Sequence, residues 1–316
     1  MYYAHFLQSK NNMRLPWLHD IEQRLTQSFK AQRFHHAQLF SGPIGVGKFA
    51  FANQLANALL CNNIAEQVAA KKSVLSACGQ CKSCLLIKAG THPDKRLTQV
   101  DGQSIGVDDI RGISDFMHHS AAQNGNKVAI IENCEKMTTA AANALLKTLE
   151  EPSQSRFLIL TTSQATQLPA TVLSRCAKTD VKVTNLALAQ QWLESLEITN
   201  YTWLPLFYSQ PLQVKYWQEQ NQLQNINTLY KFATEFKQSH NFTELIAIIN
   251  KQPELIRIFT LFLSEQLKQQ LMQGMSFDAY QNVQHALNEF LQNNTKILGL
   301  NLPLAVSRLA SVLRNN

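Results

Sequence analysis

Short apolar runs alternate with longer amphipathic stretches along the first half of the chain. Three runs have the length and composition of strands buried on both faces: AQLFS (37–41), VAII (128–131) and RFLILTT (156–162). Three neighbouring stretches carry apolar residues at helical spacing: 48–60, 107–119 and 138–151. Strands that alternate with helices predict an α/β domain, in which a parallel sheet with right-handed crossovers is flanked by helices.

The pattern becomes helical after about Val183 and remains so. We therefore expect an α/β domain over 13–181, a small helical domain over 182–221 and an all-helical domain over 222–316. The glutamine-rich and asparagine-rich segment 218–227 marks the second junction. The first twelve residues have no clear structural pattern, and no prediction rests on them.

A glycine-rich loop joins the first predicted strand to the helix that follows it. The pattern G-x-x-x-x-G-K is complete at Gly42, Gly45, Gly47 and Lys48. In such a loop, backbone N–H groups surround phosphate oxygens and the lysine reaches the terminal phosphates. Phe49 follows where a working loop has Ser or Thr, whose hydroxyl binds Mg²⁺. The alternative is a strand-to-helix turn that binds no nucleotide.

The second half of a nucleotide-hydrolysing site would lie at the end of the strand 128–131. Glu132 stands where a magnesium-associated carboxylate is expected, but Asn133 follows in place of a second carboxylate. An amide cannot accept a proton from the attacking water. Together with Phe49, this predicts a nucleotide-binding fold that does not hydrolyse ATP, and it leaves ATP binding open. The run VAIIEN is a buried core strand under either interpretation.

Four cysteines lie close together in the sequence: Cys61, Cys78, Cys81 and Cys84. This spacing predicts a structural Zn²⁺ site within a module over 61–84, because four thiolates around zinc leave no open position for catalysis. The alternative is four reduced thiols. His92 is a conceivable substitute ligand, although its place before a proline favours a turn.

Several other side chains are better explained by packing than by chemistry. Cys134 and Cys176 are predicted to be small core residues, and His35 and His36 have no partner acid that the sequence assigns. Four tryptophans are expected at helix interfaces: Trp17, Trp192, Trp203 and Trp217.

The amino-acid composition limits the kinds of partner the protein can have, but it does not identify one. The 29 Lys and Arg residues exceed the 22 Asp and Glu residues, which gives a net charge of +7. This excess fits a nucleic acid or an acidic protein as partner, but many proteins that bind neither carry it. No apolar run reaches the ~18 residues of a membrane span, and no signal-peptide pattern is present. We expect a cytoplasmic protein that does not contact membranes.

With these motifs placed, the chain resembles the bacterial clamp-loader subunits of the AAA+ class, and most closely the delta-prime family of DNA polymerase III. The resemblance is carried by LPWL (15–18), HHAQLFSGPIGVGK (35–48), AGTHPD (89–94) with the four cysteines, NALLKTLEEP (143–152) and ATVLSRC (170–176). The last two strings together are highly specific for clamp loaders. The helical part of the chain after Cys176 resembles that family only in its length and in its helical secondary structure.

The resemblance implies an AAA+ P-loop domain with an inserted zinc module, a helical lid over 182–221 and a C-terminal collar over 222–316. It also implies a non-hydrolysing stator subunit, with gamma/tau and delta subunits as partners and with the sliding clamp and primed DNA reached through the complex. Arg175 matches the arginine finger of the family, which acts on the ATP of a neighbouring subunit. Its alternative is a surface arginine at the end of a strand.

Two other functions remain open at the level of sequence. An active gamma/tau-like ATPase shares the same strings, but Phe49 and Asn133 depart from it, and the segment 207–217 offers no clear basic sensor although Lys215 lies there. A zinc-containing DNA-binding protein outside any clamp loader would bind DNA with a steep salt dependence. The scattered basic residues argue against that function.

Overall fold

The computed structural model of the chain describes residues 15–69, 74–98, 104–123, 125–296 and 301–314. These residues form two compact units. The first contains the described residues up to Thr199 together with Leu204–Tyr216, and the second contains Asn200–Trp203 and the described residues from Trp217 onward. The opening segment 1–12, which was set aside in the sequence, lies outside the described residues.

The first unit contains a parallel sheet of five strands with the order β2-β3-β4-β1-β5. The strands are β1 (Ala37–Ser41), β2 (Lys95–Thr98), β3 (Lys127–Ile131), β4 (Arg156–Thr162) and β5 (Ala177–Asp180). In the register of the central strands, Leu39 pairs with Leu160 and Ile130 with Ile159. The three predicted strands and the parallel sheet are confirmed. The edge strands β2 and β5 were not predicted.

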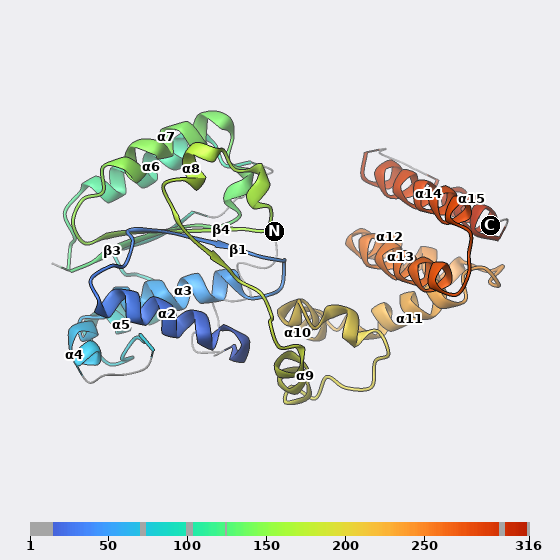
Figure 1. Cartoon of the computed structure of the whole chain (residues 1–316), viewed down its shortest axis with the longest axis horizontal. Helices are drawn as coiled ribbons and strands as arrows, with labels where there is room; N and C mark the ends of the chain where they lie inside the picture. The colour runs from blue at the N-terminus through green and yellow to red at the C-terminus, as the bar shows by residue number, and fades with distance from the viewer. Residues whose placement is uncertain (1–14, 70–73, 99–103, 124, 297–300, 315–316) are drawn as a thin grey trace. The chain divides into compact units, whose positions relative to one another are not determined.

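Helices cover both faces of this sheet (Figure 1). One face carries α2 (His19–Lys30) and α3 (Lys48–Leu59), and the opposite face carries α6 (Val107–His118) and α7 (Thr139–Glu150). Helix α7 begins at a proper cap, because the Thr138 side chain accepts a hydrogen bond from the backbone N–H of Ala141. The predicted α/β layers are therefore present.

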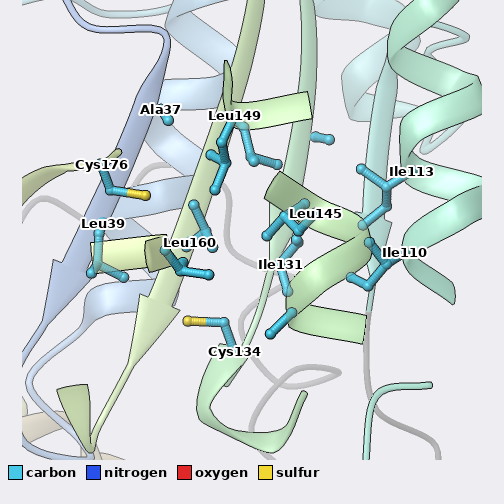
Figure 2. Close-up of a cluster of buried hydrophobic side chains, with 14 of the residues drawn as sticks. Ala37, Leu39, Ile110, Ile113, Ile131, Cys134, Leu145, Leu149, Leu160 and Cys176 are labelled. Carbon is cyan, nitrogen blue, oxygen red and sulfur yellow. The ribbon is translucent and has the colours of Figure 1, made fainter. Parts of the chain in front are cut away.

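A buried apolar cluster fills the space between the sheet and α6 and α7 (Figure 2). Its members include Ile131 and Leu160 from the strands and Leu145 from α7. Cys134 and Cys176 belong to the same cluster, and burial raises the pKa of both thiols, that of Cys176 to about 11. Both cysteines are thus core residues that stay protonated, as predicted.

Shorter elements complete the first unit. They are α4 (Ile64–Ala69), α5 (Lys82–Lys88), α8 (Ala170–Leu173), α9 (Leu186–Glu194) and α10 (Pro211–Glu219), whose last turn belongs to the second unit. Among the described residues of both units, the 3-10 helices are η1 (Pro16–Leu18), η2 (Cys134–Lys136), η3 (Ala165–Gln167), η4 (Leu204–Phe207) and, in the second unit, η5 (Pro253–Leu255). Helix α9 packs against η1 through Trp17 and Trp192, whose ring centroids are 5.2 Å apart in an edge-to-face contact.

The described residues of the second unit form helices joined by turns and loops, with no strand among them. Its helices are α11 (Leu223–Thr234), α12 (Thr243–Lys251), α13 (Ile256–Met272), α14 (Phe277–Lys296) and α15 (Leu302–Arg314). Helix α13 lies at the centre and contacts both α11 and α14. Buried aromatic rings fill the unit, including Trp203, Phe259 and Phe262. Among the described residues, no helix has the combined length and apolarity needed to cross a membrane.

Candidate functional site

The glycine loop leaves the carboxyl end of β1 and enters α3, as the sequence predicts. Its backbone carbonyls are held by other parts of the same unit. The Gly45 oxygen accepts a hydrogen bond of 2.9 Å from the backbone N–H of Leu212, and the Val46 oxygen accepts one of 2.9 Å from Nε1 of Trp17. The loop is therefore fastened by α10 and by the segment that precedes α2.

Two glycines of the loop have no room for a side chain. A Cβ at Gly42 would lie 2.0 Å from the carbonyl oxygen of Val181. A Cβ at Gly47, where φ is +104°, would lie 2.3 Å from Cδ1 of Leu15. The Val181 carbonyl beside Gly42 and the positive φ of Gly47 thus favour glycine by themselves, so the glycine pattern alone is not evidence for a bound phosphate.

Lys48 is buried and points into its own loop. Its Nζ donates hydrogen bonds of 2.8 Å to the carbonyl oxygens of Gly42 and Pro43. Burial lowers the pKa of Lys48 to about 8, although the nearby carboxylates of Glu135 and Glu132 act in the opposite direction. The amine that would contact phosphates in a working loop is committed to two backbone oxygens here.

The positions expected to bind magnesium and activate water are both altered. Phe49 is buried at the start of α3 and offers no hydroxyl. Glu132 is buried at the end of β3, and burial raises the pKa of its carboxyl to about 7. Asn133 adopts a left-handed conformation with φ of 51°, and its backbone N–H donates 3.3 Å to Oγ1 of Thr161. The site therefore offers a phenyl ring at position 49 and an amide at position 133, where a hydrolytic site has a hydroxyl and a carboxylate.

Glu135 is a part of this site that the sequence reasoning missed. Its Oε1 accepts hydrogen bonds from the hydroxyl and the backbone N–H of Ser163, at 2.6 and 3.2 Å. The short helix η2 returns Glu135 toward the ends of β3 and β4. The only signal in the sequence was an acidic residue three positions after Glu132. The turn formed by η2 is what brings this carboxylate near Lys48.

The four clustered cysteines meet in space. Their sulfur atoms all lie within 4.8 Å of one another, with Cys61 to Cys81 at 4.0 Å and Cys78 to Cys84 at 3.8 Å. A tetrahedral ion with bonds of about 2.3 Å to sulfur would separate its ligands by about 3.8 Å. This cluster could hold a metal ion.

Backbone donors surround these sulfurs. Hydrogen bonds of 3.3 to 3.5 Å run from the N–H groups of Cys78, Cys81 and Cys84 to the sulfurs of Cys61, Cys78 and Cys81. The N–H groups of Gln80 and Cys81 lower the pKa of the Cys78 thiol to about 6, whereas burial raises the pKa values of Cys61 and Cys84. N–H donors that stabilise a thiolate are what a metal ligand needs.

His92 is not a member of the cluster. It is buried, with Nε2 2.6 Å from Oγ of Ser83, and its Nδ1 accepts a hydrogen bond of 3.1 Å from the backbone N–H of Asp94. The same Ser83 hydroxyl donates to the carbonyl oxygen of Leu60. Because both ring nitrogens have partners, His92 ties α5 to the sheet and is not available as a ligand.

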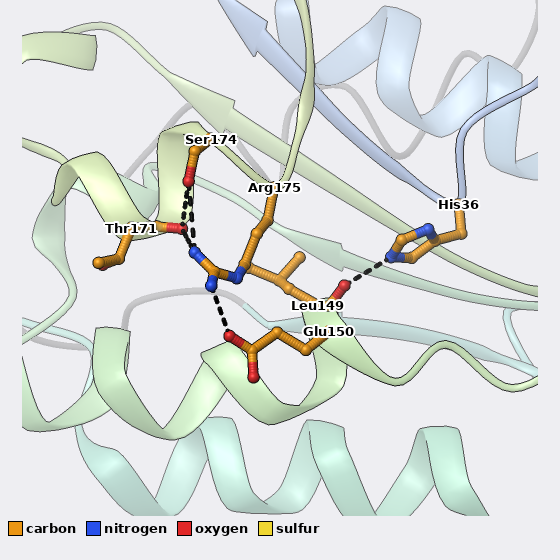
Figure 3. A network of polar contacts seen from close by, with 6 residues as sticks. All are labelled: His36, Leu149, Glu150, Thr171, Ser174 and Arg175. Atoms are coloured by element: carbon orange, nitrogen blue, oxygen red, sulfur yellow. Dashed lines mark hydrogen bonds and ion pairs between the residues drawn. The ribbon is translucent and has the colours of Figure 1, made fainter.

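Arg175 lies in the turn between α8 and β5 (Figure 3). Its Nη2 forms an ion pair of 2.6 Å with Oε1 of Glu150, and its Nη1 donates 2.9 Å to the carbonyl oxygen of Thr171. The side chain is 35% exposed. Nε2 of His36 is 3.1 Å from the carbonyl oxygen of Leu149. His36 therefore packs against the end of α7, which agrees with a structural role.

Comparison with known proteins places this arrangement in one family. A family model described as "DNA polymerase III, delta subunit" matches residues 17–185, which is more than half of the chain. The chain is 39% identical over 181 residues to the DNA polymerase III subunit delta' of Haemophilus influenzae. The chain belongs to the delta-prime family of DNA polymerase III subunits. That alignment covers 57% of the chain and 53% of the relative, so the chain spans about half the length of the curated relatives it matches.

Two further proteins extend the comparison of this delta-prime family member. The DNA polymerase III subunit tau of Bacillus subtilis is 36% identical over 163 residues, which cover 51% of the chain and 27% of that protein. A crystal structure of a gamma-subunit-related protein from Thermotoga maritima aligns with a TM-score of 0.50 and 18% identity, and it covers 92% of the chain and 99% of that protein. This likeness shows a shared fold.

Proposed function

We propose that the chain is a non-hydrolysing stator subunit of the DNA polymerase III clamp loader, which helps to place the sliding clamp on primed DNA. Membership of the delta-prime family supports the assignment. The observation that carries the absence of hydrolysis is the buried phenyl ring of Phe49 at the head of α3. A phenyl ring cannot bind Mg²⁺, and Asn133 cannot act as a base for the attacking water.

The proposed organisation has three parts that serve this function. An AAA+ domain over 13–181 would contact gamma/tau and delta subunits, with a lid over 182–221 next in sequence. A collar over 222–316 would join the ring of subunits. The similarity to a tau subunit over 163 residues supports a common ring, because related subunits form related interfaces.

We propose Zn²⁺ as the ion for Cys61, Cys78, Cys81 and Cys84. Sulfur separations of 3.8 and 4.0 Å fit a tetrahedral thiolate site. Four protein ligands leave no open position, so the ion would stabilise the fold of residues 61–84 and take no part in catalysis.

We propose Arg175 as an arginine finger that acts in trans. Its guanidinium is partly exposed on the turn after α8, where a neighbouring subunit can approach. There it would stabilise the negative charge that develops on the transferred phosphate of ATP in that neighbour. The chain would then support hydrolysis that it does not perform itself.

The test is ATP turnover by the clamp loader reconstituted with gamma/tau and delta subunits of the same organism. Replacing Arg175 with Ala is expected to slow turnover at the site it serves by about a thousandfold or more. Total ATP turnover by the complex would fall by the part that is contributed by the neighbouring site that Arg175 serves. The control Lys178→Ala removes an exposed charge on the adjacent β5 and should leave turnover unchanged. If the complex with Arg175→Ala assembles normally and hydrolyses ATP as fast as the unchanged complex, Arg175 is not an arginine finger.

An active gamma/tau-like ATPase is the second candidate, favoured by the 36% identity to a tau subunit. It requires magnesium-dependent turnover by the chain alone. Phe49 and Asn133 oppose it for the reasons given above.

A further inference from the structure

The guanidinium of Arg175 is held at several points by its own chain (Figure 3). Nη1 donates to the carbonyl oxygen of Thr171 at 2.9 Å and to Oγ of Ser174 at 3.3 Å, and Nη2 pairs with Glu150. Within the described part of the chain, Nε makes no hydrogen bond. The Nε–H of this partly exposed guanidinium thus remains able to donate to an anion from outside, while Nη1 and Nη2 are anchored.

The ion pair between Arg175 and Glu150 contributes little to the stability of the fold. Both side chains are more than one third exposed, at 35% and 48%, and surface ion pairs of this kind are weak. Its geometry is nevertheless short, at 2.6 Å between charged groups. An ion pair that adds little stability but is well oriented is suited to fixing the direction of the Arg175 side chain.

Glu150 occupies an electrostatically unfavourable position. It is the last residue of α7, where the helix dipole and the free carbonyls disfavour a negative charge. A hydrogen bond from His36 to the carbonyl oxygen of Leu149 fixes the same helix end (Figure 3). Burial lowers the pKa of His36, which keeps the ring neutral with its proton on Nε2 for this bond. The carboxylate is therefore carried on a firmly placed turn and faces the arginine.

Arg175 needs a partner such as Glu150 because the helix that precedes it is short. Helix α8 has four residues, Ala170–Leu173, and the arginine follows it in a turn. A free arginine side chain samples many rotamers, and that freedom would have to be lost each time a phosphate is contacted. Restricting the side chain in advance lowers the entropy lost in the transition state.

We infer that Glu150 is a positioning residue, which orients Arg175 so that its free Nε–H meets the terminal phosphate of a nucleoside triphosphate bound by a neighbouring subunit. This inference rests on the proposed function of Arg175 and adds the residue that directs it. Glu150 does not touch the nucleotide; its effect passes entirely through the guanidinium.

The experiment is a double-mutant cycle in the reconstituted complex. Steady-state ATP turnover is measured for the unchanged chain, Glu150→Ala, Arg175→Ala and the double variant. We define the Arg175-dependent share as the turnover that Arg175→Ala abolishes. Glu150→Ala is expected to lower this share by about 3- to 10-fold, with the ATP concentration at half-maximal rate changed less than about twofold. In the Arg175→Ala background, Glu150→Ala should have no further effect.

Two variants separate positioning from general damage. Glu150→Gln keeps an oxygen acceptor without the charge and should restore part of the lost turnover. Glu151→Ala removes the next carboxylate along the chain, an exposed one, and should behave like the unchanged protein. Incorporation of each variant into the complex is checked by size-exclusion chromatography.

The outcomes separate this inference from the proposed function. If Arg175→Ala slows turnover while Glu150→Ala does not, or if Glu150→Ala raises it, the positioning role is wrong and the finger remains. A loss with Glu150→Ala that persists in the Arg175→Ala background also overturns it. If Arg175→Ala has no effect, the proposed finger fails and the positioning role fails with it.

Discussion

Single residues decide how the glycine loop is interpreted. Lys48 has the identity expected of a phosphate-binding lysine, yet its amine donates to the carbonyl oxygens of Gly42 and Pro43. Phe49, one position later, is buried where a hydroxyl is required. From Phe49 and Asn133 the sequence predicts a loss of hydrolysis, which stays a prediction, and it does not reveal the internal bonds of Lys48.

Phe49→Ser restores the hydroxyl and tests whether one residue is enough. We expect no magnesium-dependent ATP turnover from the isolated variant, because Asn133 still cannot accept a proton. We also expect a loss of about 3–5 kcal/mol in the free energy of unfolding, since a buried ring is removed. Urea denaturation and a turnover assay measure the two effects.

The matched control for this prediction is Phe157→Ser, which shortens a phenylalanine on β4 that is only partly buried, away from the glycine loop. Turnover by Phe49→Ser above the level of that control would mean that Asn133 does not prevent hydrolysis. The account of the altered site would then be wrong.

Other residue-level contacts join distant parts of the sequence and have no local signal. Glu150 and Arg175 are brought together by the ends of α7 and α8, and Glu135 meets Ser163 because β3 and β4 are neighbours. Each residue could be noted in the sequence as polar. Their pairing depends on the tertiary fold, which spacing along one element does not encode.

At the scale of helices and strands, the degree of burial of a strand determines whether its sequence reveals it. The three central strands are apolar runs and were predicted, whereas β2 (KRLT) and β5 (AKTD) are edge strands with mostly polar, partly exposed residues. Such segments lack an apolar run and bury only part of each residue. The order β2-β3-β4-β1-β5 likewise follows from packing.

The cysteine segment is the element whose stability should depend most on a ligand. We expect about one zinc ion per chain in purified protein, and loss of zinc from Cys78→Ser because one thiolate of the closed site is missing. Removal of the ion should expose residues 61–92 to protease, while the sheet stays folded. Atomic absorption and limited proteolysis with and without chelator provide the readouts.

Cys176→Ser is the control for this prediction, because Cys176 is buried in the apolar cluster beside the sheet, outside the group of four. Its zinc content should equal that of the unchanged chain. A metal-free protein with unchanged protease resistance in segment 61–92 would rule out zinc as the support of that segment.

Across the whole molecule, the family match and the fold likeness cover different parts of the chain. The family model covers residues 17–185, which contain the sheet, the glycine loop, the cysteines and Arg175. The fold likeness to the Thermotoga maritima protein covers 92% of the chain. The family match thus contains the site, whereas the helical second unit lies outside it, and a collar role for that unit stays a proposal based on resemblance.

On the proposed function, the molecule supports ATP hydrolysis without performing it. Steady-state turnover with Mg²⁺ and primed DNA tests this most directly, measured for the purified chain alone and after addition of gamma/tau and delta subunits. The account predicts background turnover by the chain alone and strong turnover in the mixture. Turnover by the chain alone that survives further purification and is lost in Lys48→Ala would contradict it.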